Sequence, residues 1–520
     1  MNRRTATITL SLFFCLNLSA FGQTSPPKNF DAFVDNVRKA FDVPGISVAI
    51  VKDGKVVLAK GYGMKKLGTD DRVDSKTNFG IASNTKAFTA TALGLLVEEH
   101  KVAWDARVID YLPWFQLSDP YVTRELTVRD LLVHRSGLGL GAGDLLWWPT
   151  STYNRKEIAK RLRHIPLATS FRTAYAYDNV LYLIAGELIE TVSGMPWEDF
   201  VQKRILDKVG MNNSNVRHSD ANRKGNVATP HAPIDGKVRV IAAFDSDNTN
   251  PAGGINSNAE DMAKWLICQL DSGRTAGGEH LFSPAVTRQL WNIVTPRTPG
   301  ATVPQQLAPL KANFLGYALG FDVRDYRGKK LVTHTGGLPG YVSRVAMIPE
   351  LNVGVAVLTN QESAEAFNAV AYTVLDHFLG AQFDYLAGFK WSKSVNDSAA
   401  ATAEAKIGSQ RDSLSKPSLP LAKYAGVYTD AWYGDVRIDC NDGKLSIQMI
   451  PTPSLGGALE HFQYNTFIAR WSDPEMRADA FVTFALNPDG SIETVKMKAV
   501  SPATDFSFDF QDLLLKPTKP

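Results

Sequence analysis

The sequence is poor in cysteine, with three in 520 residues. Cys15 lies in an apolar N-terminal stretch, Cys268 in an apolar run and Cys440 at the end of an expected strand. Isolated cysteines in different parts of a chain are more often buried small apolar residues than disulfide partners or metal ligands. The nine histidines form no H-E-x-x-H pattern. We therefore expect no disulfide framework, no metal and no cofactor.

An excess of charge of one sign is also missing. The chain has 56 Lys and Arg against 53 Asp and Glu, a net charge of +3. This balance gives no electrostatic case for a nucleic-acid or anionic-lipid partner. After the N-terminus, no stretch is long and apolar enough to predict a stable membrane span. The length exceeds one ordinary core, so two or three domains are expected.

The N-terminus has the pattern of an export signal. Arg3 and Arg4 precede the mostly apolar residues 8–18, and residues 20–22 (Ala-Phe-Gly) form a small-x-small cleavage site. Cys15 follows a bulky phenylalanine where a lipoprotein signal requires a small residue. We expect residues 1–22 to be a cleaved signal peptide and the protein to be secreted or periplasmic. The alternative is a disordered or anchored leader.

The following pattern predicts one antiparallel sheet interrupted by helices. Two apolar segments flank Asp53-Gly54, which is a strong hairpin signal. Residues 101–327 are largely helical in pattern, and strands then resume. This predicts an α/β (α+β) fold: an antiparallel sheet flanked by helices, with an inserted all-helical subdomain. The expected elements are helices at 30–41, 126–134, 182–192, 260–270 and 362–379 and strands at 46–51, 55–60, 330–334, 342–348 and 353–358, with turns at Gly336-Gly337 and 350–352.

The C-terminal quarter differs in composition. Residues 389–417 are rich in Ser, Ala, Lys, Asp and Gln, which is typical of a linker. Short alternating strands follow, separated by two Asp-Gly turns. They predict a small antiparallel β-barrel over 418–520. The expected domains are thus 1–22, 23–388, 389–417 and 418–520.

Ser83 and Lys86 form an S-x-x-K pair at the start of the uncharged apolar run 87–97. Residues three apart share a helix face, so the hydroxyl and the amine would meet. A lysine can activate a serine if burial or nearby charge lowers its pKa. The pattern alone is weak, because Ser25 to Lys28 and Ser413 to Lys416 also match it.

Two downstream motifs supply the partners that serine-lysine chemistry requires. Tyr177 could move protons if Lys86 and other cations lower its pKa. Asn179 could hydrogen-bond Lys86 and a substrate amide. In His334-Thr335-Gly336-Gly337, the glycines would let backbone N–H groups approach a reacting carbonyl.

The three motifs occur in the order found in the penicillin-recognising serine hydrolases, and the chain resembles their class C β-lactamase-like branch. That branch includes D-alanyl-D-alanine carboxypeptidases, D-amino-acid peptidases and carboxylesterases. The resemblance covers about residues 30–385, and the C-terminal part resembles the lipocalin-like barrel of some members. It implies that Ser83 is the acylated nucleophile, Lys86 its base and Tyr177 the acid/base for the leaving group. The N–H groups of Ser83 and Gly337 would form the oxyanion hole.

His334 departs from the lysine usual in β-lactamases and carboxypeptidases. A neutral imidazole holds a substrate carboxylate less well than an ammonium group does. We therefore expect an exported serine hydrolase acting through an acyl-enzyme on small esters, short amides or D-amino-acid peptides. The alternatives are a D-Ala-D-Ala carboxypeptidase or β-lactamase, and a penicillin-binding sensor without turnover. The oligomeric state is left open.

Three further features receive structural interpretations. The glycine-rich segment 137–143 is expected to be a mobile loop rather than a phosphate site. Trp147 and Trp148 are interpreted either as a cleft rim or as core. His134 serves no G-x-S-x-G elbow, so we expect helix-end packing.

Overall fold

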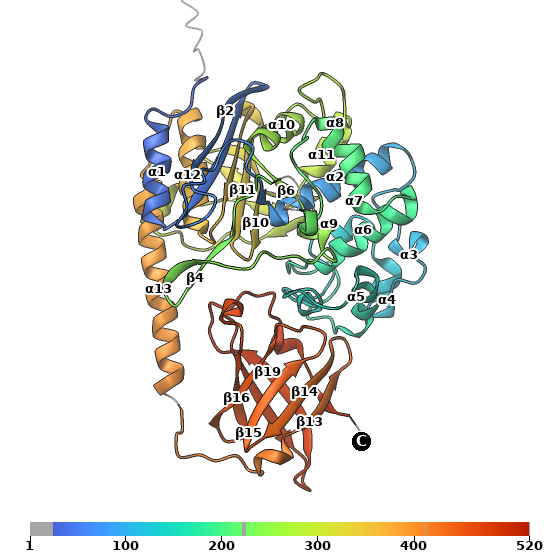
Figure 1. The fold of residues 1–520 in the computed structure, drawn as a ribbon. Coiled ribbons are helices and arrows are strands. Elements are labelled where there is room, and N and C mark those ends of the chain that lie inside the picture. Colours follow the sequence, from blue (N-terminus) through green and yellow to red (C-terminus); the bar gives the residue numbers. More distant parts are fainter. Residues whose placement is uncertain (1–23, 221–224, 410, 519–520) are drawn as a thin grey trace, which may run out of the picture.

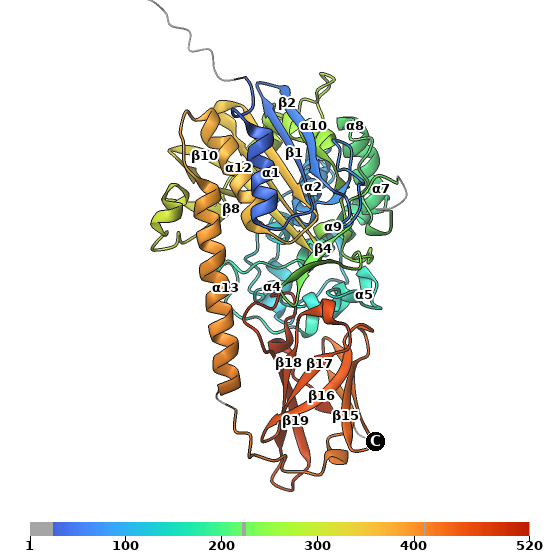
Figure 2. The same ribbon diagram turned by 60° about the vertical axis from the view of Figure 1, so that its left-hand side comes forward.

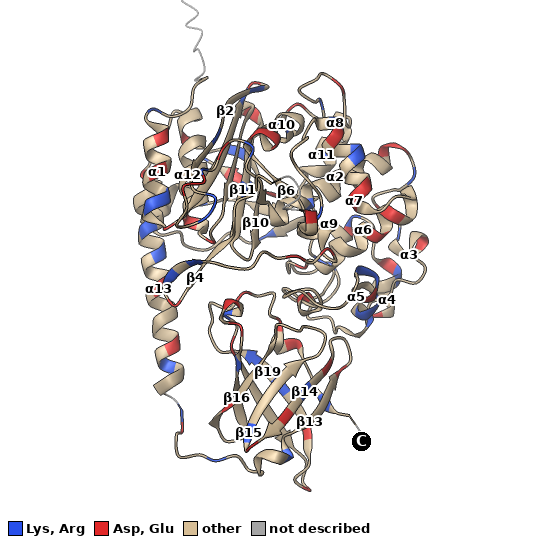
Figure 3. Ribbon diagram, in the orientation of Figure 1, with Lys and Arg blue, Asp and Glu red and all other residues tan. Residues whose placement is uncertain are grey.

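The computed structural model describes residues 24–220, 225–409 and 411–518, so the expected signal peptide lies outside the described residues. The described chain forms a mixed α/β body and a C-terminal barrel (Figure 1). Within these ranges, every helix is too short or too polar to cross a bilayer. Lys and Arg are interspersed with Asp and Glu over the ribbon (Figure 3).

The body is built on an eight-stranded antiparallel sheet in the order β2-β1-β12-β11-β10-β9-β8-β7. Alternate residues of the central strands belong to two separate apolar cores: Ala49 and Val51 to one, Val48 and Ile50 to the other. This follows from the two-residue period of a strand that is buried on both faces. Its strands are β1 (Gly45–Lys52), β2 (Lys55–Gly63), β7 (Thr295–Arg297), β8 (Leu315–Tyr317), β9 (Asp322–Tyr326), β10 (Lys329–Leu338), β11 (Tyr341–Ile348) and β12 (Val353–Thr359).

Helices cover both faces of the sheet. The helix α10 (Ala259–Leu270) packs on β1 and β12 from one side, while α1 (Phe30–Ala40) and α12 (Ala364–Phe378) contribute to the other core. The expected fold class is confirmed, including the helical insertion between β2 and β7. Besides α10, the insertion contains the helices α2 (Thr85–Glu98), α3 (Val108–Tyr111), α4 (Pro120–Glu125), α5 (Arg155–Arg161), α6 (Val180–Ser193), α7 (Trp197–Val201), α8 (Asp207–Val209), α9 (Asn250–Gly253) and α11 (Pro284–Leu290). It also contains two small two-stranded sheets. In one, β3 (Phe79–Gly80) pairs with β6 (Asn256–Ser257), and in the other, β4 (His231–Ile234) pairs with β5 (Lys237–Val240).

Three expectations in the body were wrong. The short strands β7, β8 and β9 were missed, because three to five residues are too few to show a period. The expected turn at Gly336-Gly337 lies inside β10, where these residues pair with Ser343 and Val342. The expected helix 126–134 is instead a loop with one 3₁₀ turn, Asp130–Leu132.

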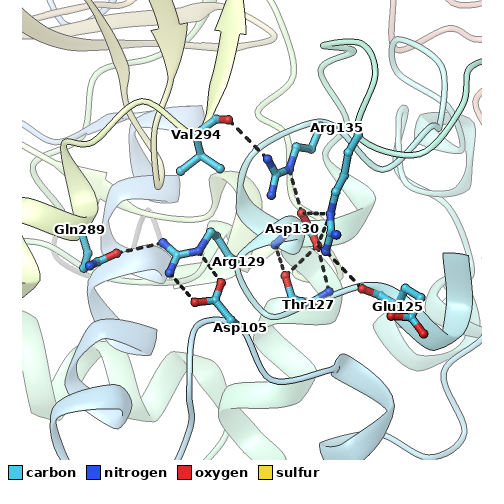
Figure 4. A network of polar contacts seen from close by, with 9 residues as sticks. Asp105, Glu125, Thr127, Arg129, Asp130, Arg135, Gln289 and Val294 are labelled. Carbon is cyan, nitrogen blue, oxygen red and sulfur yellow. Dashed lines mark hydrogen bonds and ion pairs between the residues drawn. The ribbon is translucent and has the colours of Figure 1, made fainter.

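A buried carboxylate fixes the shape of that loop. Asp130 accepts hydrogen bonds from the backbone N–H and hydroxyl of Thr127, and its own N–H donates to that hydroxyl (3.3 Å); this reciprocal pair fixes the single 3₁₀ turn. It also accepts from Arg135 Nε (2.8 Å) and Arg172 Nη2 (2.5 Å). Burial raises the pKa of Asp130, but the bonds from Arg172 and Thr127 outweigh burial and leave that pKa below its usual value. Figure 4 shows this cluster beside the separate Asp105–Arg129 pair.

The C-terminal barrel is a nearly closed eight-stranded sheet in the order β19-β18-β17-β16-β15-β14-β13-β20. Leu515, just before β20, bridges to Val495 of β19 and so nearly joins the two edges. This confirms the expected small antiparallel barrel. Its strands are β13 (Gly426–Asp430), β14 (Gly434–Asn441), β15 (Lys444–Met449), β16 (Gly456–Gln463), β17 (Thr466–Trp471), β18 (Ala480–Leu486), β19 (Ile492–Ala499) and β20 (Lys516–Pro517).

Most of the segment expected to be a linker, 389–417, is helical. It belongs to α13 (Tyr385–Ser409), which leaves the body and extends alongside the barrel (Figures 1 and 2). Alanine-rich residues favour a helix, and Lys393 pairs with Asp397 one turn later. Glu404 of α13 accepts a hydrogen bond from Ser501 of the barrel (2.9 Å). The connection is therefore mostly a helix rather than an irregular chain, and the domain limits themselves remain a prediction.

We predict that Asp130→Asn lowers the free energy of unfolding by about 2 kcal/mol, because two charge-assisted hydrogen bonds from arginines are weakened. The control is Asp105→Asn, whose side chain is 77% exposed; it should cost less than about 1 kcal/mol. Urea unfolding midpoints at pH 7 provide the measurement. The difference should shrink as pH falls through the lowered pKa of Asp130, because protonation removes the same charge. Equal losses in the two variants would contradict this assignment.

Candidate active site

Ser83 lies in the 3₁₀ turn Ala82–Asn84 that leads from β3 into α2. Ala82 has a left-handed φ of 49°, which is strained for a residue with a Cβ. Asn84 Nδ2 donates to Ser343 Oγ (2.8 Å), and Ser343 Oγ donates to the carbonyl of Ile81 (2.7 Å). The turn is therefore anchored to strand β11 on both sides of the serine.

Lys86, on the first turn of α2, is 0% exposed. Its Nζ donates to Ser83 Oγ (3.1 Å), Asn179 Oδ1 (2.7 Å) and the carbonyl of Ala252 (3.1 Å). Burial lowers the pKa of Lys86 to about 7, against the opposing charges of Asp144 and Asp178. The structure thus brings Ser83, Lys86 and Asn179 together, as the motifs predicted.

Asp144 and Asp178 were not identified from the sequence. Asp144 Oδ2 accepts from Asn179 Nδ2 (2.9 Å), so the Asn179 amide bridges the lysine and this carboxylate. Burial raises the pKa of Asp144 to about 7 and that of Asp178 to about 8. Burial therefore brings the pKa values of one amine and two carboxyls close together near neutrality. Asp178 is the middle residue of the Tyr177-x-Asn179 motif, where the residue type is not specified, and Asp144 follows the glycine-rich segment outside any motif.

Tyr177 is partly buried and lies above the lysine, with Lys86 Nζ 4.9 Å from its ring centroid. The condition set from the sequence, that nearby cations lower its pKa, is not met. Burial raises the pKa of Tyr177 well above its usual value, and a hydrogen bond with Ser83 offsets only part of this. Tyr177 is consequently a neutral phenol, which can donate or relay a proton but does not persist as a phenolate base.

His334 is 3% exposed and faces Tyr317. Its Nδ1 lies 2.5 Å from the Thr335 carbonyl and must donate there, so Nε2 accepts from Tyr317 Oη (2.8 Å). Burial and the nearby Lys86 charge lower the pKa of His334 to about 3. The imidazole is therefore neutral, as expected from the residue type, and both nitrogens are occupied by protein groups.

The two glycines after Thr335 have different roles. A Cβ at Gly336 would lie 2.2 Å from the carbonyl of Ile81 and 2.6 Å from Ser343 Oγ, so only glycine allows β10 to approach the Ser83 turn this closely. A Cβ at Gly337 would meet nothing within 4 Å. Gly337 borders the cleft, whose other walls include Ser83, Tyr177, His334 and Thr335. The backbone at Gly337 thus faces the space beside the serine.

Comparison with known proteins identifies this arrangement. The beta-lactamase family model matches residues 30–378. The chain belongs to the beta-lactamase family. Residues 410–517 match a second model, a domain of unknown function (DUF3471).

Several members or structural neighbours span most of the chain. The unguisins hydrolase of Aspergillus violaceofuscus is 28% identical over 89% of this chain and 86% of its own. The octameric penicillin-binding protein homologue from Pyrococcus abyssi has a TM-score of 0.57 at 22% identity, over 94% of this chain and 99% of its own. The D-amino acid amidase from Ochrobactrum anthropi has a TM-score of 0.55 at 21% identity, over 71% of this chain and 99% of its own. The structural likenesses concern the fold.

In this family member, the barrel closes one side of the cleft. The cleft, of about 380 Å³, is lined by Asp505, Phe506 and Ser507 as well as by body residues. The Phe506 ring lies edge-on to Tyr177, with centroids 6.1 Å apart. A neighbouring cavity of about 730 Å³ shares Trp148, Gly337, Leu338 and Asp505 with the cleft. Sequence reasoning missed the barrel residues because they lie more than 300 positions from Tyr177.

The other features expected near the site also find places. Trp147 and Trp148 are buried yet line the cleft, so both interpretations of the pair hold. The glycine-rich segment packs against the barrel rather than forming a free loop: a Cβ at Gly141 would lie 2.8 Å from Phe506. His134 is buried against Tyr177, with centroids 4.3 Å apart, at the end of a loop and not of a helix.

Cysteines and metal-binding groups add nothing to the site. Cys268 is buried and free, and burial raises its pKa to about 12; Cys440 is free as well. In the ranges that the structure describes, no three His, Cys, Asp or Glu side chains are grouped to hold a metal ion.

We predict that Gly336→Ala destabilises the protein by about 1–3 kcal/mol, because its Cβ must displace β10 from the Ser83 turn. The matched control is Gly337→Ala, which adds the same methyl group into open space and should leave the melting temperature near the wild-type value. Thermal unfolding followed by circular dichroism measures both. A Gly336→Ala protein with unchanged melting temperature would contradict the close approach of β10 to Ile81.

Proposed function

We propose that this protein is a serine hydrolase that acts through an acyl-enzyme on short amides, D-amino-acid peptides or small esters. The supporting observation is the contact of a buried Lys86 amine, with a pKa lowered to about 7, with the Ser83 hydroxyl at 3.1 Å. An amine that is about half neutral at pH 7 can accept the serine proton, which an ordinary lysine, almost fully charged there, cannot.

In the proposed reaction, Ser83 Oγ attacks the substrate carbonyl carbon as its proton passes to Lys86 Nζ. The carbonyl oxygen gains negative charge next to the N–H groups of Ser83 and Gly337. Tyr177 gives its phenolic proton to the leaving nitrogen or oxygen, and the Lys86 ammonium restores it. The carbon–nitrogen or carbon–oxygen bond breaks, leaving the acyl-Ser83 ester. A water molecule then attacks the acyl carbon and gives a proton to the same groups. The bond to Ser83 Oγ breaks, the serine regains its proton and the acid is released.

The surroundings of His334 favour substrates that carry no free carboxylate next to this residue. The imidazole is neutral and its nitrogens are taken by Tyr317 and Thr335. The cation lining the same cleft, Arg297, donates to Asp322 (2.8 Å) and packs 4.2 Å from the Tyr175 ring centroid. Its charge is therefore already partly neutralised. A peptide amide or ester fits these walls better than a carboxylate-bearing β-lactam.

The comparisons support amide substrates. The unguisins hydrolase and the D-amino acid amidase are named for hydrolysis or amide chemistry, and the former covers both domains. The adjoining 730 Å³ cavity offers room for a second part of a peptide. The sensor alternative is disfavoured because Ser83, Lys86 and Tyr177 are all present and in contact. We also propose that the protein is exported, on the N-terminal sequence pattern alone.

The experiment is steady-state hydrolysis by residues 23–520. Short-chain p-nitrophenyl esters, D- and L-alanine p-nitroanilides and a chromogenic cephalosporin are compared. We expect turnover of esters or D-amides, loss of at least about 1,000-fold in Ser83→Ala, and little cephalosporin hydrolysis. The matched control is Ser413→Ala, since Ser413 begins another S-x-x-K tetrapeptide but is exposed.

The outcomes separate the candidate functions. Fast, Ser83-dependent cephalosporin turnover would replace the proposal with a β-lactamase. No turnover, together with a stable penicillin adduct on Ser83 by mass spectrometry, would replace it with the sensor. Activity that survives Ser83→Ala would contradict the assignment of Ser83 as the nucleophile.

The rate should depend on pH through Lys86. The amine is the active form, so kcat/KM should fall about tenfold per pH unit below the lysine pKa of about 7. Tyr177 stays a neutral phenol, so no loss from its ionisation is expected up to pH 9.5. Lys86→Arg should abolish activity, because a guanidinium keeps its proton. A profile flat from pH 5 to 9 would contradict the assignment of Lys86 as the base.

A further inference from the structure

Ser507, in the loop between β19 and β20 of the barrel, contacts the polar chain that ends at Lys86. Its Oγ donates to Asp144 Oδ2 (2.9 Å), and its side chain is buried, with 4% of the residue exposed. The same Oδ2 accepts from Asn179 Nδ2 (2.9 Å), and Asn179 Oδ1 accepts from Lys86 Nζ (2.7 Å). A continuous path of three hydrogen bonds thus runs from the barrel to the lysine.

Asp144 is fixed from its other side as well. Its Oδ1 accepts from Trp147 Nε1 (2.9 Å). Asp509, two residues after Ser507, accepts from the N–H groups of Gly143 (2.7 Å) and Leu145 (2.9 Å). The barrel therefore holds both the side chain of Asp144 and the backbone on either side of it. These contacts are internal to a buried core that spans the two domains.

We propose that Ser507 is a positioning residue for Lys86, acting through Asp144 and Asn179, and that the barrel is therefore a part of the active site. The inference rests on the function proposed above. Ser507 itself touches neither Ser83 nor Lys86 in the contacts described, so its effect must pass through the two intermediate side chains.

The direction of the effect follows from the charges near the lysine. Asp178, His134, His334, Tyr177 and Tyr182 face Lys86, and Asp178 and Asp509 also face Asp144. The Ser507 hydrogen bond favours the charged form of Asp144. Without it, Asp144 is protonated more readily, the lysine loses a stabilising negative charge, and its ammonium gives up its proton at lower pH.

The experiment uses the full chain, residues 23–520, with Ser507→Ala. We expect kcat to fall about tenfold, as for loss of a hydrogen bond to a charged group, with KM changed less than kcat. The acidic limb of the pH profile should move to lower pH. Ser507→Thr, which keeps the hydroxyl, should recover part of kcat and shift the limb back.

Ser501→Ala is the matched control. Ser501 lies in the same loop between β19 and β20, but its hydroxyl donates a hydrogen bond to the exposed Glu404. Its kinetics and pH limb should equal those of the wild type. A folded Ser507→Ala protein with wild-type kcat and pH profile would overturn the proposal. If the alanine variant does not fold, Ser507→Cys, with a weaker donor, takes its place and must show a shift in the same direction.

A second readout separates this inference from the proposed function. The pH dependence of covalent labelling of Ser83 by a fluorophosphonate reports the state of Lys86 without requiring a substrate. If the wild type labels but turns over none of the substrates, the proposed function fails and the Ser507 shift can still be measured. If the labelling profiles of wild type and Ser507→Ala coincide, the inference fails whatever the substrate.

Discussion

The burial of one amine is the constraint on which the rest of the site depends. Lys86 is completely enclosed, and three acceptors hold its Nζ at 2.7 to 3.1 Å. Removing an amine from water disfavours its charged form, which is how a lysine becomes a base near neutral pH. The same burial would be too costly without compensation, and the nearby carboxyl groups of Asp144 and Asp178 supply it. Reactivity and stability of this site are therefore set by one balance between desolvation and charge.

That balance requires both domains. Asp144 keeps its place because donors reach it from Asn179 in the body and from Ser507 in the barrel. The barrel also covers the glycine-rich segment that carries Asp144, through Asp509 and Phe506. A deletion of the barrel would expose this carboxylate to water and change the electrostatics of the lysine. The barrel therefore functions as a wall of the cleft rather than as an independent module.

The sequence allowed much of this to be predicted, and the failures have physical causes. Periodicity and turn residues predicted the sheet, its helices and the barrel, because those signals are local. The pairing of Ser83 with Lys86 and Asn179 came from three motifs and the resemblance that they carry. The Ser507–Asp144 contact joins residues 363 positions apart, and neither belongs to a motif. The direction of the Tyr177 pKa shift depends on how far the folded site removes water from the phenol, which a single motif does not show.

The neutral state of His334 illustrates how such long-range packing selects chemistry. An imidazole at this position could in principle carry a charge below its usual pKa and hold a carboxylate. Here Tyr317 from β8 donates to one nitrogen and the Thr335 carbonyl accepts from the other, so both nitrogens of the neutral imidazole are satisfied. The nearby Lys86 charge opposes a second cation in the same enclosed space. A site that uses a buried lysine as its base thus has an electrostatic reason to keep the adjacent residue uncharged, and this favours neutral groups of the substrate at that end of the cleft.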